Sequence, residues 1–284
     1  MISSMTIPKA STAVAFTLGD ANCRIQKLEG FGVPIARLLK DDFPIQHGGR
    51  MISQYYQSRR IVMGGTIVKD TIANFMSYKK ELADAFTFEN AEKALTINLL
   101  GGTTLSIDVI AVSELRIVQD RGMVTMALWE IELEAADPLL YGGTLNVETG
   151  GITTIGGGFT IPFTIPFAIS GGITDQMTCV NAGNARVFPS RVVLYGPGTD
   201  YILENRTLSQ QLIYTGTIAD GDYVEVDMKN RTALYNGLTN VYGNVSGHFW
   251  ELVAGTNTIA LTVASGDGAA TAARIEWYDA YWGV

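Results

Sequence analysis

The residue types and spacings that usually carry catalysis are scarce in this chain. Only two histidines occur, His47 and His248, so no His-Glu-x-x-His zinc motif can form. Neither a Gly-x-Ser-x-Gly nucleophile turn nor a phosphate-binding P-loop is present. His248 lies close in sequence to Glu251, but no nucleophile accompanies them, and we interpret it as a packed or surface histidine. Cys23 and Cys179 lack metal-ligand spacing and are expected to be free, buried thiols. We therefore predict no catalytic residue, cofactor or metal.

Two groups of acidic residues are candidate sites. Asp222, Glu225 and Asp227 offer oxygen ligands, but their spacing is not that of a calcium loop, and a solvated strand face is favoured. The second group alternates with apolar residues along one predicted strand: Glu130, Glu132 and Glu134 on one face, and Trp129, Ile131 and Leu133 on the core face. Burying three unpaired carboxylates is costly, so we expect a wet face. It is either an ordinary solvated surface or the border of an aqueous channel.

Exposed aromatic residues would offer another kind of site. Tyr235, Tyr242, Phe249 and Trp250 lie in the aromatic-rich second half of the chain and could contact a sugar or a protein partner. Packing in a core or an interface is the favoured interpretation of such residues. A carbohydrate-binding or adhesion module that uses these aromatics remains the alternative function.

Composition indicates the elements that position these residues. The 284-residue chain is 47% hydrophobic and only 17% charged, and it contains 31 glycines. β-Branched and aromatic residues favour strands, while glycines supply turns, so the chain is expected to be mainly β and not disordered. A net charge of −8 argues against a large basic nucleic-acid-binding face. No signal peptide and no apolar run of the ~18 residues needed for a membrane helix are apparent, so we expect no membrane partner and synthesis in a cytoplasm.

The order of the helix, strand and glycine-rich patterns along the chain predicts two domains. The first, residues 1–140, contains hairpins, one of them turning at Gly101-Gly102, and one amphipathic helix over 66–86, with Thr66 as its N-cap. Before the helix, a strand from Arg59 is expected to end at Gly64-Gly65. A glycine-rich linker is expected over 141–160, followed by a β-sandwich over 161–284. A short repeat at the boundary, residues 159–167, is expected as an edge strand or an extended lead-in. Further strands are predicted at Arg191–Tyr195, Gln211–Ile218, Tyr223–Asp227, Arg231–Tyr235, Asn257–Ala264 and Ala270–Tyr281.

Several short motifs in the second half resemble one known family. They are Gly-Asn-Ala-Arg-Val-Phe-Pro from Gly183, Val-Leu-Tyr-Gly-Pro from Val193, Glu-Asn-Arg-Thr from Glu204, Gly-Asp-Tyr-Val-Glu-Val-Asp from Gly221, Arg-Thr-Ala-Leu-Tyr-Asn-Gly from Arg231, and Phe-Trp-Glu-Leu-Val-Ala-Gly-Thr-Asn from Phe249. The series resembles the C-terminal half of the distal tail proteins of long-tailed, siphovirus-type bacteriophages or prophages. The first half is similar more loosely, chiefly in the Ala-Asp-Pro-Leu-Leu-Tyr segment that ends at Tyr141. These are motifs of turns and core, so the resemblance assigns no active-site residue to this chain.

The resemblance implies a fold and a role. The fold would be an N-terminal β-barrel-like domain with one helix and a C-terminal galectin-like or carbohydrate-module-like sandwich. The protein would form a hexameric ring in the virion tail, linking the tail tube protein to the baseplate or tail tip, and DNA would pass through the lumen without specific binding. It would be made in the cytoplasm of the host bacterium. Besides the carbohydrate-binding alternative, an inactive glycosidase is a third and disfavoured interpretation.

Overall fold

The computed structural model describes residues 1–10, 15–89, 91–120, 122–151 and 175–284. The chain divides into two compact units. Unit 1 comprises residues 1–143 together with 281–284, and unit 2 comprises residues 144–280. The chain therefore crosses between the units twice. Among the described residues, no helix is long and apolar enough to span a membrane.

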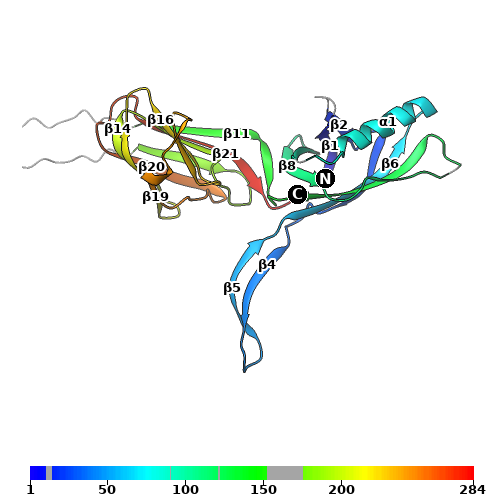
Figure 1. The fold of residues 1–284 in the computed structure, drawn as a ribbon, viewed down its shortest axis with the longest axis horizontal. Helices are drawn as coiled ribbons and strands as arrows, with labels where there is room; N and C mark the ends of the chain where they lie inside the picture. The colour runs from blue at the N-terminus through cyan, green and yellow to red at the C-terminus, as the bar shows by residue number, and fades with distance from the viewer. Residues whose placement is uncertain (11–14, 90, 121, 152–174) are drawn as a thin grey trace, which may run out of the picture. The chain divides into compact units, whose positions relative to one another are not determined.

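The described residues of unit 1 form the strands β1 to β10 and the helix α1 before the chain enters β11 (Figure 1). They are β1 (Ile2–Pro8), β2 (Ala15–Leu18), β3 (Cys23–Glu29), β4 (Ala36–Asp42), β5 (Gly49–Tyr56), β6 (Arg59–Val68), α1 (Ile72–Ala85), β7 (Lys93–Leu99), β8 (Thr104–Ala111), β9 (Arg116–Val118) and β10 (Met126–Ala135).

The pairing in unit 1 is antiparallel and surrounds one core. The strands follow one another in the order β3, β6, β10, β8, β7, β1, β2, with β9 also paired to β10. Within the described part of the chain β2 and β3 do not pair with each other, so this barrel-like arrangement stays open. β4 and β5 pair with each other in a separate hairpin. The predicted hairpin around Gly101 and Gly102 is confirmed as β7–β8, and both glycines have positive φ.

The helix is shorter than the sequence indicated. Residues 66–68 belong to β6, and α1 begins after Thr71, whose side-chain oxygen accepts a hydrogen bond from the Asn74 amide at 3.2 Å. Thr66 is therefore not the N-cap. Phe75, Leu82 and Ala85 are buried against the core. Apolar spacing from residue 66 onward cannot separate the end of a strand from the start of a helix, because Thr66–Val68 is compatible with both.

The expected end of a strand at Gly64-Gly65 is also wrong, since β6 continues through both residues. These glycines allow a close approach of neighbouring strands. A Cβ atom on Gly65 would clash with the carbonyl oxygen of Arg24 in β3. The two glycines are therefore required by the packing of the sheet and do not form a turn.

The first part of the predicted linker is not a linker but a strand, β11 (Leu140–Gly151). Residues 141–151 form a strand that pairs with β8 at Tyr141 and Gly142 and continues into unit 2. Its glycines suggested a loop, but backbone pairing outweighs their low strand propensity. The rest of the predicted linker, and the repeat over residues 159–167, lie outside the described residues.

Unit 2 is a β-sandwich of two antiparallel sheets (Figure 1). One has the strand order β18, β17, β16, β13, β21, β11, and the other the order β12, β20, β14, β15, β19. The elements after β11 are β12 (Asp175–Asn181), β13 (Arg191–Tyr195), β14 (Gly198–Asn205), β15 (Gln210–Ile218), β16 (Tyr223–Asp227), β17 (Thr232–Tyr235), β18 (Thr239–Asn240), η1 (Tyr242–Asn244), β19 (Val245–Gly247), β20 (Gly255–Ser265) and β21 (Ala272–Tyr281). All six strands predicted from residue 191 onward are present within two residues of their expected ends.

Candidate functional site

The acidic residues of β10 lie on one face of the sheet formed by β3, β6 and β10. The alternation predicted from the sequence is confirmed, because Trp129, Ile131 and Leu133 on the opposite side of the strand are at most 2% exposed. Glu130, Glu132 and Glu134 stand opposite Gly64, Val62 and Arg60 of β6.

Each of these carboxylates has a partner. Lys27 of β3 contacts Glu130 at 2.7 Å, Arg60 of β6 forms an ion pair with Glu132, and the Ser58 hydroxyl donates to Glu134 at 2.6 Å. The Lys27 ammonium lowers the pKa of Glu130, and the carboxylate in turn raises the pKa of Lys27. The side chains of Glu130 and Glu132 stay 43% and 27% exposed, so they do not form an unpaired buried cluster.

A hollow of about 540 Å³ lies over this charged face. Its charged lining residues have both signs: Lys27, Glu29, Arg60, Glu114, Arg116, Glu130 and Glu132. The mixed charge is suited to a hydrated surface. It offers no enclosed site for a small ligand.

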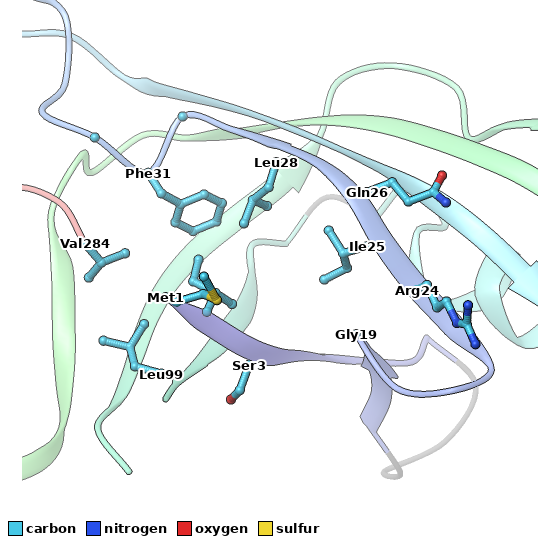
Figure 2. A pocket seen from close by; sticks show the side chains of 13 residues that line it. Met1, Ser3, Gly19, Arg24, Ile25, Gln26, Leu28, Phe31, Leu99 and Val284 are labelled. Carbon is cyan, nitrogen blue, oxygen red and sulfur yellow. The ribbon is translucent and has the colours of Figure 1, made fainter. Parts of the chain in front are cut away.

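A larger hollow, of about 710 Å³, lies elsewhere in unit 1 between β1, β3 and the last residues of the chain (Figure 2). Most of the labelled side chains around it are apolar, with Arg24, Gln26 and Ser3 nearer the periphery. The apolar side chains come from five segments: Met1 and Ile2, Ile25 and Leu28, Phe31, Leu99, and Val284. No local sequence pattern indicates this hollow, because its lining joins residues from both ends of the chain.

The four aromatic residues singled out in unit 2 do not form one platform. Trp250 is 1% exposed and belongs to the core, in agreement with the favoured interpretation of packing, so it is no longer a candidate contact residue. The Tyr235 hydroxyl donates to Asp222 at 2.7 Å, which lowers the pKa of Asp222. Tyr242, 45% exposed, stacks on Phe249 with ring centroids 6.2 Å apart. Tyr242 and Phe249 therefore form a partly exposed pair, while Tyr235 is half-buried and engaged with Asp222.

The second acidic group is divided among separate interactions. Asp222 binds Tyr235 and Asn236, Glu225 forms an ion pair with Arg191 at 2.8 Å, and Asp227 accepts from the backbone of the following turn. The three side chains do not converge. Within the described ranges no group of three or more His, Cys, Asp or Glu residues could hold a metal ion.

One functional candidate has no signal in the sequence. Arg59 opens β6 and looks like any strand-end arginine, yet it is only 3% exposed. Its guanidinium donates to four backbone carbonyl groups from three segments: Gly30, Gly32, Pro138 and Trp282. Contacts of this kind depend on the tertiary fold, so no local pattern could reveal them.

With this geometry established, the chain can be compared with known proteins. The fold is a mainly antiparallel β fold with one helix, and a family model described as the siphovirus-type tail component, C-terminal domain, matches residues 182–281. The crystal structure of the Dit protein of phage SPP1, described as a paradigm of the hub adsorption apparatus in phages that infect Gram-positive bacteria, is similar over 97% of this chain and 98% of that chain, with a TM-score of 0.65 and 12% identity.

Two structures of the phage P2 baseplate in its activated conformation are also similar. The one with Ca covers 97% of this chain and 98% of that chain at 10% identity, and its TM-score is 0.47. The one with Sr covers 98% of each chain at 9% identity, with the same TM-score of 0.47. No curated protein matches this chain. The comparisons confirm the resemblance to distal tail proteins, by sequence over residues 182–281 and by fold over almost the whole chain.

Proposed function

We propose that this chain is a structural protein of a siphovirus-type phage tail, the ring-shaped hub that joins the tail tube to the baseplate or tail tip. The observation that carries the proposal is the similarity of fold to SPP1 Dit over 97% of the chain, joined to the family match over residues 182–281. The role is structural and not enzymatic, and the assembled protein resides in the virion tail after synthesis in the host cytoplasm.

The β4–β5 hairpin supports homo-oligomerisation, with six copies in the proposed ring. An isolated two-stranded hairpin is marginally stable in water. This one exposes adjacent large residues along both strands: Leu38 and Leu39, Met51 and Ile52, Tyr55 and Tyr56. Because successive strand residues point to opposite faces, both faces of the hairpin are apolar. Exposed apolar surface of this extent is typical of protein interfaces.

Purified protein tests the ring directly. Light scattering and negative-stain imaging should show six copies in a ring. Ile52→Glu, on the hairpin, should dissociate it, whereas Leu238→Glu, at an 86% exposed position of unit 2, should leave it intact. Monomers at high concentration, together with phage particles whose tails do not bind an antibody against the chain, would overturn the proposal.

The charged face of β3, β6 and β10 is proposed to border the lumen. Lys27 and Arg60 are held by Glu130 and Glu132, so their positive charges are not available to phosphate groups. Nucleic-acid affinity comes chiefly from free cationic side chains, so DNA would pass without being retained. Replacing Glu130, Glu132 and Glu134 by Lys should make assembled rings retain DNA at low salt. A structure of the ring with these residues on its outer wall would contradict the lumen position.

A further inference from the structure

The root of the β4–β5 hairpin is a junction of several backbone segments. The chain enters β4 through residues 30–35 and leaves β5 through residues 57–58. The Gln57 amide donates to the Ile35 carbonyl at 2.9 Å, which closes the hairpin at its root. Since β4 and β5 pair only with each other within the described residues, the contacts at the root determine how firmly the hairpin is held.

Arg59 lies directly after the hairpin and fastens this junction. It donates to Gly30 and Gly32 on the incoming segment at 2.6 and 2.7 Å. It also donates to Pro138 at 2.8 Å and to Trp282 at 2.6 Å. A guanidinium suits this place because it is planar, carries five N–H donors and keeps its charge when buried. Burial lowers the pKa of Arg59, and the negative charge of Asp137 acts in the opposite direction.

The last residues of the chain lie against the same root. The Trp282 ring packs on the Tyr56 ring, at the end of β5, with a centroid distance of 4.2 Å. The Val284 amide donates to the Phe31 carbonyl at 3.0 Å. Between them, Gly283 is so close to the incoming segment that a Cβ atom would lie 2.7 Å from the Phe31 oxygen and 2.8 Å from the Gly32 carbonyl carbon.

We propose that residues 281–284, with Arg59, form a latch that holds the root of the β4–β5 hairpin in one orientation. The latch joins both strands of the hairpin, at its root, to the last residues of the chain, which begin at the end of β21 and belong to unit 1 like the hairpin itself. Only the use of the hairpin in ring assembly depends on the proposed function. The latch itself is a property of one subunit.

A matched pair of glycine variants tests the latch. Gly283→Ala introduces the clash with residues 31–32, whereas Gly32→Ala, on the facing segment, adds a Cβ atom that meets nothing within 4 Å. In Gly283→Ala we expect hydrogen exchange of the Gln57 and Val284 amides to accelerate about tenfold. The overpacked residue should shift the equilibrium between the closed and the open root toward the open state by about a power of ten. Exchange in β7 and β8 should be unchanged. Gly32→Ala should behave as the wild type.

A second measurement reports the orientation of the hairpin. Spin labels at His47→Cys, between β4 and β5, and at Lys80→Cys, on α1, should give a narrow distance distribution that broadens with Gly283→Ala and with Arg59→Met. Both native cysteines are buried, so the labels report the introduced sites. Arg59→Lys keeps the charge but loses the planar fork, and we expect it not to restore the narrow distribution.

The outcomes separate the latch from general destabilisation and from the proposed function. Unchanged exchange at Gln57 and Val284, faster exchange spread equally over β7 and β8, or an unchanged distance distribution in Gly283→Ala would each overturn the latch. Measured in the Ile52→Glu background, in which the ring is expected to dissociate, these readouts report a single subunit. Their outcome therefore decides the latch whether or not the wild-type chain assembles.

Discussion

The two thiols are inert for a physical reason that can be measured. Cys23 and Cys179 are buried, and burial raises the pKa of each thiol to about 12. The thiolate is the reactive form, and at pH 8 it would be almost absent. We expect no reaction of the native protein with a disulfide reagent at pH 8, and reaction of both thiols in denaturant. Prompt reaction of a thiol in the native protein would contradict this.

The glutamates of β10 should contribute little to stability, although each has a partner. Exposed ion pairs are weak because water and salt screen them. Replacing Glu130, Glu132 and Glu134 together by Gln should leave the thermal midpoint at pH 7 within experimental scatter. Leu133→Ala, on the buried side of the same strand, should cost about 2–5 kcal/mol.

The sign of the pH effect can be checked with the same variant. The pKa of Glu130 lies below its ordinary value, so its small contribution is present above the ordinary glutamate pKa of about 4.3 and is lost as the pH falls. The wild type and the triple Gln variant should therefore converge in acid. A large destabilisation at pH 7, absent in acid, would show that the pairs on this face matter more than their exposure indicates.

At the level of elements, the start of α1 makes a specific prediction. The Thr71 side chain satisfies the Asn74 amide, one of the helix donors that lack an intrahelical partner. Thr71→Ala should reduce the free energy of unfolding by about 1 kcal/mol, and Thr71→Ser should restore most of it. Chemical denaturation measures both values. Equal stability of the Ala and Ser variants would mean that the cap does not contribute.

The sequence predicts elements well where one local pattern dominates. The alternation from Trp129 to Glu134 and the turn at Gly101-Gly102 lead directly to β10 and to the β7–β8 hairpin. Prediction fails where a distant strand decides the outcome. Gly65 is in a strand because β3 lies beside it, with Ile25 in the opposite position. Residues 141–151 form β11 because β8 offers a partner at Tyr141 and Gly142 and β21 is the neighbour on the other side.

The candidate functional residues show the same division between what a local pattern predicts and what distant segments decide. Outward placement of the three glutamates follows from period-two alternation, but their partners Lys27 and Arg60 come from other strands and could not be foreseen. The sequence could not separate the buried Trp250 from the exposed Tyr242, because an aromatic residue has the same sequence appearance in a core and on a surface. Arg59 was missed because its partners are backbone carbonyls far away in the sequence, the farthest of them at Trp282.

The double crossing between the units has a consequence for the whole molecule. A cut in the glycine cluster at residues 156–158 would leave β11 on the first fragment and β21 on the second, yet these strands are neighbours in one sheet. Asn146 also donates to Asp279 across them at 3.1 Å. With a protease site inserted after Gly157, the cleaved protein should elute as one species in native chromatography and separate in detergent. Separation without denaturant would contradict this pairing.

Because the chain crosses between the units twice, its first and last residues both belong to unit 1. Met1 and Val284 line the same hollow (Figure 2), and all residues between 144 and 280 belong to unit 2. Unit 2 is thus an insertion near the end of unit 1, and the order of the segments is not fixed by the fold. A circular permutant, with a short glycine-serine linker from Val284 to Met1 and new ends in the glycine cluster, should fold to the same structure.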